Sequence, residues 1–356
     1  MLKQIALSLT LALSLLAVPC LAQDIKISGT PEKLNLVWQA RFTAPEDDFS
    51  QLPPIEGVNI VSPCWFAITN SAGNISDKAR VTYADNLHSK GYKVWALITN
   101  SFNPDLTHAL LQNKAGRAHA IEQMLFYADK YKLDGYNLDF ENIAGWDRDL
   151  LTDFTKEITN ALHAKDLTVS MDITIPSGEL YWSECYDRLA LGKTLDYVML
   201  MTYDQHHPNG HRSGPNASLG WVEKNLVKTL EFIPKDKLLL GLPLYMRSWQ
   251  HKYNRSYAIG KTLSMAGAEK LLKEKKITHV WQEKDGQYYF TYQGNDNTTY
   301  KIWQENKTSL ALKADLVNKY ALAGIASWRK GFETPDVWPE LNMVLSGLNS
   351  PIYIGN

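Results

Sequence analysis

The chain of 356 residues is poor in cysteine and nearly balanced in charge. It contains 3 cysteines, at positions 20, 64 and 185, and no C-x-x-C pair. This spacing supports neither a zinc site nor a dense disulfide framework. We expect Cys64 and Cys185 to be free thiols, because they fall on distant predicted elements. With 37 basic and 38 acidic residues, nothing in the composition predicts binding to nucleic acid or to an anionic membrane.

Beyond its first residues, the sequence lacks low-complexity tracts, short repeats and long runs of one charge. Residues 1–22 combine Lys3 with the apolar run 5–18 and with small residues before a plausible cleavage after Ala22. We interpret this segment as a secretory signal peptide, with lipidation at Cys20 or an uncleaved anchor as alternatives. We therefore expect a secreted or cell-envelope protein that keeps no membrane span after cleavage.

What the sequence does repeat is a strand-like apolar run followed by a helix-like stretch. Continuous apolar runs are typical of strands buried on both faces, as in a parallel sheet. Amphipathic stretches such as 117–131, 149–164 and 218–232 separate them. Eight such units predict an α/β protein with a (β/α)₈ TIM barrel. The expected strands are residues 34–38, 57–66, 93–99, 133–141, 167–175, 196–203, 237–244 and 324–328.

The seventh and eighth expected strands are separated by about eighty residues, whereas a crossover usually takes a dozen or somewhat more. The intervening stretch holds a helical segment, 264–276, and short β-like pieces at 279–283, 287–292 and 299–304. A D-G pair within 284–286 predicts a hairpin between the first two pieces. We therefore expect a small α+β insertion between strands seven and eight. The expected parts are a signal peptide at 1–22, a catalytic barrel at 23–244 and 307–356, and the insertion at 245–306.

One stretch on the fourth expected strand, 133–142, reads D-G-x-N-x-D-x-E at its centre. Asn137, Asp139 and Glu141 are two residues apart, so they share one face of a strand. Burying acids is costly, and acids at this spacing push each other's pKa values apart. The alternative is the charged edge of an ordinary strand, but the flanking Gly135 and the loop that follows favour a functional site.

This stretch closely resembles the active-site strand of the family 18 glycoside hydrolases, D-G-x-D-x-D-x-E. Asp134, Gly135, Asp139 and Glu141 match that pattern, whereas Asn137 stands where many chitinases have Asp. Asn at this place, and the absence of an S-x-G-G motif at 95–100, resemble the bacterial cell-wall and spore-cortex branch of the family. The resemblance covers nearly the whole mature chain and implies the same barrel, with the insertion as one wall of a substrate groove.

The sixth expected strand ends in a second motif. Residues 199–204 read M-L-M-T-Y-D and resemble the family's M-x-Y-D motif. By that resemblance, Tyr203 hydrogen-bonds the N-acetyl group of the substrate, and Met201 and Asp204 belong to the site. A packed Met-rich strand ending in a turn Asp is the alternative.

The last two expected strands also end in residues typical of the family. Residues 243–247 resemble its P-L-Y-G-R segment, with Met246 in place of Gly, and imply that Tyr245 and Arg247 contact substrate. Trp328 matches the Trp that floors the sugar site, and an aromatic plane suits the C–H face of a pyranose. A core Trp is the alternative.

The resemblance implies substrate-assisted catalysis, an exception to the usual two-carboxylate scheme. Glu141 acts as general acid, and the 2-acetamido carbonyl of the sugar attacks the anomeric carbon while Asp139 orients that group. Asp134 holds the start of the strand, and we expect Asp134 and Asn137 among the substrate-binding residues. Asn137 can hydrogen-bond Asp139 but cannot share a proton with it. The expected partner is an N-acetylated polysaccharide or oligosaccharide, from chitin, peptidoglycan or an N-glycan core.

Two other function classes stay open. A sugar-binding lectin on the same barrel is the main alternative, although such members usually lose the acid that Glu141 supplies. A metal-dependent deacetylase is more distant. His206, His207 and His211 follow the sixth strand, but their spacing lacks the helix and the Glu of zinc hydrolases. We expect no metal, no cofactor and a monomeric chain.

Overall fold

The computed structural model describes residues 32–40, 42, 48–208, 210, 212–253, 255–294 and 297–348. Residues 1–22, expected to be a signal peptide, and His211 lie outside these ranges. Within them, no helix is both long enough and apolar enough to cross a membrane.

Eight parallel strands form a closed barrel, which confirms the predicted fold. Each strand pairs with the next, and the last returns to pair with the first. All eight apolar runs of the sequence are strands of this barrel. They are β1 (Leu34–Gln39), β2 (Ile60–Ile68), β4 (Lys93–Thr99), β5 (Gly135–Asp139), β6 (Thr168–Thr174), β7 (Tyr197–Met201), β8 (Leu238–Pro243) and β14 (Gly324–Trp328). A short strand, β3 (Ile75–Asp77), adds to β2 in antiparallel fashion.

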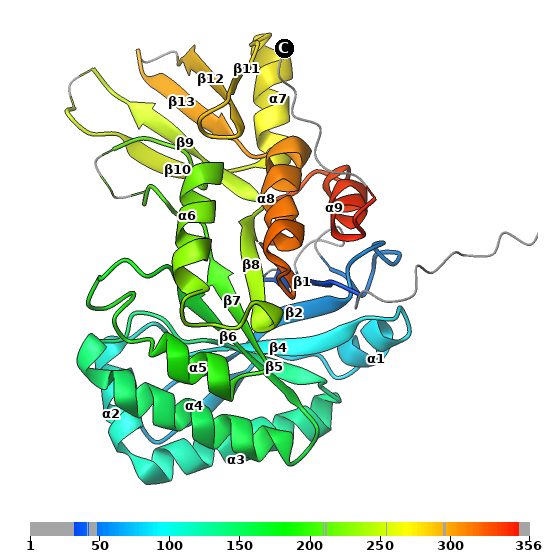
Figure 1. The fold of residues 1–356 in the computed structure, drawn as a ribbon, viewed down its shortest axis with the longest axis vertical. Helices are drawn as coiled ribbons and strands as arrows, with labels where there is room; N and C mark the ends of the chain where they lie inside the picture. The colour runs from blue at the N-terminus through cyan, green and yellow to red at the C-terminus, as the bar shows by residue number, and fades with distance from the viewer. Residues whose placement is uncertain are drawn as a thin grey trace, which may run out of the picture. The chain divides into compact units, whose positions relative to one another are not determined.

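Helices surround the barrel (Figure 1). They bury an extensive apolar layer between themselves and the outward faces of the strands. A smaller apolar cluster, which includes Trp38, Trp95 and Met199, fills the inside of the barrel. The helices are α1 (Tyr83–His88), α2 (Pro104–Gln112), α3 (Lys114–Tyr131), α4 (Arg148–His163), α5 (Arg188–Thr194), α6 (Leu219–Thr229), α8 (Lys307–Tyr320) and α9 (Val337–Leu345), with single 3₁₀ turns at Gly145–Asp147 and Lys235–Lys237.

A second sheet lies between β8 and β14 in the sequence, as predicted, and occupies one end of the barrel in Figure 1. The predicted turn joins β11 to β12, and Gly286 there has a φ of 63° that suits glycine. The first two strands of this sheet, β9 and β10, were not predicted, because both mix polar and apolar residues. The elements are β9 (Tyr245–His251), β10 (Ile259–Ser264), α7 (Met265–Lys275), β11 (Val280–Gln282), β12 (Gln287–Gln293) and β13 (Thr299–Gln304), with sheet order β10-β9-β13-β12-β11.

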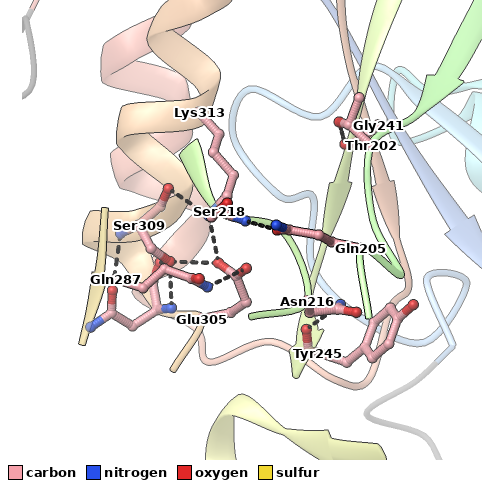
Figure 2. A network of polar contacts seen from close by, with 11 residues as sticks. Thr202, Gln205, Asn216, Ser218, Gly241, Tyr245, Gln287, Glu305, Ser309 and Lys313 are labelled. Carbon is pink, nitrogen blue, oxygen red and sulfur yellow. Dashed lines mark hydrogen bonds and ion pairs between the residues drawn. The ribbon is translucent and has the colours of Figure 1, made fainter. Parts of the chain in front are cut away.

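A buried polar network joins this sheet to helix α8 (Figure 2). The carboxylate of Glu305 accepts hydrogen bonds from Gln287 Nε2 at 2.6 Å and Ser309 Oγ at 2.6 Å. It also pairs with Lys313 Nζ at 2.9 Å, and neither charged side chain is exposed. On the barrel side, Asn216 Nδ2 donates to the backbone O of Tyr245 at 3.1 Å. These contacts fix the insertion against the barrel.

Both cysteines of the described chain are free thiols, as predicted. Cys64 lies half-buried on β2, and Cys185 is buried after β6. Both side chains act as small apolar groups of the core.

Candidate active site

The polar row of β5 faces the inside of the barrel. Asn137 is fully buried and Asp139 is 6% exposed, and Asn137 contacts Met199 of the inner cluster. Leu138 and Phe140 point the other way and pack into the layer beneath the helices. The period-two alternation predicted from the sequence therefore describes this strand correctly.

Glu141 lies two residues beyond the end of β5, half-buried at the carboxyl end of the barrel. Burial raises the pKa of its carboxyl to about 7, and the negative charge of Asp204 adds to this rise. A hydrogen bond with Asp139 acts in the opposite direction on the pKa of Glu141. The net effect is an acid that keeps its proton in a large fraction of molecules at neutral pH.

Asp139 is the more deeply buried acid of the row. Burial raises its pKa well above the usual range, and the nearby charges of Glu141 and Asp172 raise it further. Acids that interact this strongly titrate as a group rather than singly. The pKa values of the site therefore belong to the group of acids and not to Asp139 alone.

The amide of Asn137 could hydrogen-bond Asp139, but in the structure both ends of the amide are directed elsewhere. Oδ1 accepts a hydrogen bond from Trp38 Nε1 at 2.7 Å. Nδ2 donates to Asp172 Oδ1 at 2.8 Å and to Ser170 Oγ at 3.2 Å. The neighbour of Asn137 is thus an acid on β6 that the sequence reading did not consider.

Asp204, in the loop after β7, bonds two predicted residues of β9. Asp204 Oδ1 accepts hydrogen bonds from the hydroxyl of Tyr245 at 2.9 Å and from the guanidinium of Arg247. Arg247 also donates to Thr262 Oγ1 at 2.7 Å. Tyr245 and Arg247 are both buried. Their polar groups orient Asp204, and direct contact with substrate, which the sequence suggested for both, stays a prediction.

Tyr203 lies half-buried beside this group, with its ring 6.3 Å from that of Tyr245. Burial raises the pKa of its hydroxyl well above its usual value, and the charges of Asp172, Glu141 and Asp139 contribute. The hydroxyl therefore stays protonated and can donate a hydrogen bond into the same space that the three acids face.

Two further predicted residues end the strands on either side of β8. Trp328 closes β14 and is half-buried, with its ring 5.8 Å from that of Trp38. The peptide bond between Trp328 and Arg329 is cis. Met201 ends β7, half-buried. Both lie at the end of the barrel that carries Glu141.

Asp134 does not join this group, which corrects its expected place among the substrate-binding residues. It precedes β5, at the opposite end of the strand from Glu141. Its Oδ2 accepts the backbone N–H of Val94 at 2.7 Å and lies 2.8 Å from His88 Nε2. Asp196 repeats this arrangement before β7, 2.9 Å from His163 Nε2. Asp134 therefore ties the start of β5 to its neighbours, which agrees with the role of holding the strand's start.

Comparison with known proteins decides the family. The family described as Glycosyl hydrolases family 18 matches residues 63–332. The chain belongs to glycosyl hydrolase family 18. It is accordingly a glycosidase, and its barrel is that of the family.

Several relatives and solved structures are similar to this family 18 chain. An uncharacterized glycosylase, YvbX, of Bacillus subtilis is 27% identical over 292 residues, covering 79% of this chain and 83% of that protein. The cortical fragment-lytic enzyme of Bacillus subtilis is 24% identical, and the match covers 70% of this chain but only 59% of that protein. The chain therefore spans little more than half of this second relative.

Solved structures share the fold. The crystal structure of a chitinase from Chromobacterium violaceum has a TM-score of 0.79 at 24% identity, covering 88% of this chain and 99% of that one. The spore cortex-lytic enzyme SleL of Bacillus cereus has a TM-score of 0.80 at 21% identity, covering 88% and 74%. At these identities the likeness shows the fold alone.

The sequence reading missed two polar residues of this family 18 site, Asn100 and Asp172. Asn100 hydrogen-bonds the backbone of Glu141, and Asp172 bonds Asn137. Asp172 could have been predicted from the sequence, because Ser170, Asp172 and Thr174 alternate with apolar residues along β6. That alternation marks an inward polar face beside the polar face of β5.

The reading also missed a group of exposed aromatic side chains on three successive loops. Phe102 follows β4, Trp146 follows β5, and Tyr181 and Trp182 follow β6, with exposures between 36% and 63%. A backbone hydrogen bond joins two of these loops near Glu141, since Ile143 N donates to Tyr181 O at 2.9 Å. The rings of Trp146 and Tyr181 meet edge to face at 5.7 Å. We call these four residues the aromatic rim.

The histidines after β7 do not form a cluster in the part of the chain that the structure describes. His206 Nδ1 lies 2.9 Å from the backbone O of Pro215. Across the described ranges, no three His, Cys, Asp or Glu side chains gather as metal ligands would.

Proposed function

We propose that this family 18 glycosidase cleaves β-1,4 bonds of an N-acetylglucosamine-containing polysaccharide, peptidoglycan or chitin, by a retaining and substrate-assisted route. The observation that carries the proposal is Glu141. Its carboxyl lies at the carboxyl end of the barrel, hydrogen-bonded to Asp139, with burial raising its pKa to about 7. An acid with a pKa near the working pH is best suited to give and take a proton within one cycle.

The first step breaks the glycosidic bond. The proton of Glu141 passes to the glycosidic oxygen, which leaves with the bonding electron pair. The carbonyl oxygen of the 2-acetamido group bonds the anomeric carbon in its place and forms a cyclic oxazolinium ion. Asp139 holds the acetamido N–H and balances the positive charge, and Tyr203 donates to the same group. Arg247 and Tyr245 hold Asp204, whose charge keeps the pKa of Glu141 high.

The second step restores the enzyme. Water gives a proton to the Glu141 carboxylate and its oxygen to the anomeric carbon, and the ring of the oxazolinium opens. The acetamido oxygen and then the water attack the anomeric carbon from opposite faces. The two inversions cancel, so the anomeric configuration is retained. Without the negative charge of Asp139, the oxazolinium ion has no counter-charge. The site is buried, and electrostatic interactions are strong there.

The aromatic rim favours a polymeric substrate. Trp146 and Trp182 offer flat apolar surfaces beside the scissile position, and aromatic rings suit the C–H faces of sugars. A rim of this kind extends the contact beyond the sugar that is cleaved. A relative named as a cortical fragment-lytic enzyme is consistent with peptidoglycan. Action outside the cytoplasm agrees with the predicted export segment at 1–22.

The test compares the protein with its Glu141→Gln variant on N-acetylglucosamine oligomers, chitin and peptidoglycan. Loss of hydrolysis with binding retained is expected, since the amide keeps the shape of the acid but has no transferable proton. General acid–base catalysis contributes roughly 10²- to 10⁴-fold to the rate. The new reducing end identifies the polymer, and NMR of the first product shows whether its anomer is retained.

Three outcomes separate the alternatives. Wild-type protein that binds the oligomers and never cleaves them is a lectin, and the hydrolase proposal is then wrong. Unchanged turnover in Glu141→Gln overturns the assignment of the acid. Activity that is lost on adding a chelator points to a metal-dependent deacetylase, which releases acetate instead of a new reducing end.

A further inference from the structure

The carboxyl of Asp172 lies inside the barrel on the strand next to that of Asp139. β5 and β6 pair in parallel, with Asn137 opposite Ser170 and Leu138 opposite Met171. The same register sets Asp139 beside Asp172. Asp172 is only 2% exposed. A buried acid is costly to charge, and such a residue calls for a partner or a function.

The amide of Asn137 shows how this acid is held. Trp38 Nε1 can only donate, and it donates to Oδ1 of Asn137 at 2.7 Å. The amide therefore has one orientation, in which Nδ2 points to Asp172 Oδ1 at 2.8 Å. A side-chain amide cannot take up a proton at neutral pH. Apart from Glu141, the general acid, the group near Asp139 that can hold one is Asp172.

We propose that Asp172 is a positioning residue of this active site and acts, from β6, as the second carboxylate beside Asp139. The inference rests on the function proposed above. As the acetamido group attacks, the proton of Asp139 crosses to the Asp172 carboxylate. Asp139 is then charged beside the oxazolinium ion, and Asp172 is neutral. One proton moves between two carboxyl groups, so atoms and charge balance. Adjacent strands are about 4.8 Å apart, which two carboxyl groups can bridge through one shared proton.

The titration of the group agrees with this arrangement. Burial is the main cause that raises the pKa of Asp172 well above its usual range, and the hydrogen bond from Asn137 opposes that rise. The charge of Asp172 in turn raises the pKa of Asp139. The charge of Glu141 also raises the pKa of Asp172. The three acids therefore titrate as one coupled group. The other ionisable groups near the pair are Glu141 after β5, Tyr203 after β7 and Cys64 on β2. Arg329, after β14, acts on Cys64.

Asp172→Asn tests this role, because the change keeps the shape and removes the proton acceptor. We expect kcat to fall by ~10²-fold, the low end of the range for proton-transfer groups, with KM little changed. The acid limb of the pH profile should also move, since Asp139 loses its titrating partner. Ser170→Ala is the matched control. It removes the uncharged acceptor of the same amide and should leave the pH profile in place.

The exchange variant Asn137→Asp/Asp172→Asn gives a sharper test. It returns the carboxylate to β5 and moves the amide to β6, while Trp38 can donate to either side chain at position 137. We expect this double variant to regain most of the kcat that Asp172→Asn loses. Asn137→Asp alone should be slower than the double variant, because it sets two acids face to face without the amide between them.

Several results overturn the inference. One is an Asp172→Asn variant with wild-type kcat and pH profile, and another is a folded exchange variant no faster than either single variant. If Asp172→Asn melts far below the wild type, the comparison of Asn137→Asp with the double variant decides instead. An inactive Glu141→Gln alongside a fully active Asp172→Asn contradicts only the role of Asp172. A fully active Glu141→Gln contradicts the proposed function itself.

Discussion

Asn100 binds the main chain of Glu141 at both of its polar atoms. Its Oδ1 accepts the backbone N–H of Glu141 at 3.1 Å, and its Nδ2 donates to the carbonyl O of Glu141 at 2.8 Å. Asn100 is 1% exposed and follows β4, so one side chain joins the ends of two neighbouring strands. The position of the acid is therefore set from the next strand as well as from its own.

Asn100→Ala should lower kcat with a smaller effect on KM. The change frees the backbone of Glu141, and a displacement of the acid by about 1 Å can cost on the order of 10²-fold in rate. Steady-state kinetics on an N-acetylglucosamine oligomer measures both constants. Thr107→Val serves as the control, because Thr107 Oγ1 accepts the second hydrogen bond of the Asn100 amide and does not touch Glu141. Equal losses in the two variants would show that Asn100 supports the loop and does not position the acid.

The raised pKa of Glu141 predicts how activity and stability depend on pH. Only the protonated acid can protonate the leaving oxygen, so kcat/KM should fall as the pH rises through about 7. The folded pKa lies above the unfolded value of 4.5, so the folded chain binds more protons between these two pH values. The free energy of unfolding should therefore decrease as the pH rises from 4.5 to about 7.

Urea unfolding of the wild type and of Glu141→Gln at several pH values measures this effect. The glutamine cannot titrate, so the variant should lose part of the decrease. A decrease of the same size in both proteins would assign it to Asp139 and Asp172, whose pKa values are also raised by burial.

Asp204→Asn should move the basic limb of the pH–rate profile to lower pH. The negative charge of Asp204 raises the pKa of Glu141, so removing that charge lowers it. Profiles of kcat/KM report the pKa values of the free enzyme. Asp134→Asn is the control, because Asp134 lies at the far end of β5 and bonds His88. A limb that stays in place in Asp204→Asn would exclude electrostatic coupling of Asp204 to the acid.

The barrel and the acid row were predictable because both depend on local periodicity. Apolar runs mark strands buried on both faces, and residues at i, i+2 and i+4 share a face whatever surrounds them. This period placed Asp139 and Glu141 correctly. The partners of the row were not predictable in the same way. The contacts of Asn137 with Trp38 and Asp172 join residues 99 and 35 positions apart, and only the register of the closed sheet sets them.

The insertion shows the same limit. Its helix and three of its strands follow from local patterns, but β9 and β10, which pair antiparallel, carry no clear alternation. Asp134 was misplaced among the substrate contacts because motif membership does not reveal which end of a strand a residue occupies. Asp134 and Glu141 belong to one motif but lie at opposite ends of β5.

Lys313→Met should strongly destabilise the fold. Lys313 and Glu305 form an ion pair in which neither side chain is exposed, so removing the lysine leaves a buried carboxylate without its counter-charge (Figure 2). Breaking such a pair on one side typically costs about 3–5 kcal/mol. Chemical unfolding of wild type and variant measures the loss. Lys319→Met, which breaks the exposed pair with Glu223, should cost far less. Similar losses in both would mean that Glu305 takes up a proton when its partner is removed.

The aromatic rim leads to a prediction that separates polymer binding from chemistry. Trp146 is 63% exposed on the loop after β5, and its only aromatic neighbour in the described chain is Tyr181. Little of the fold depends on a ring this exposed. If it stacks on a sugar beyond the cleaved bond, Trp146→Ala should weaken the binding of long chains alone. Aromatic stacking of this kind is worth about 1 kcal/mol, or roughly fivefold in kcat/KM.

The measurement compares Trp146→Ala with wild type on a polymer and on a short chromogenic N-acetylglucosaminide. The fall should appear with the polymer, mainly in KM, and not with the short substrate, which ends before the rim. Phe126→Ala is the matched control, since Phe126 is 60% exposed on α3, outside the barrel. A loss of equal size on both substrates would place Trp146 at the cleaved sugar. No loss on either would remove the rim from the binding surface, because an exposed ring that touches the chain of sugars cannot be deleted without cost.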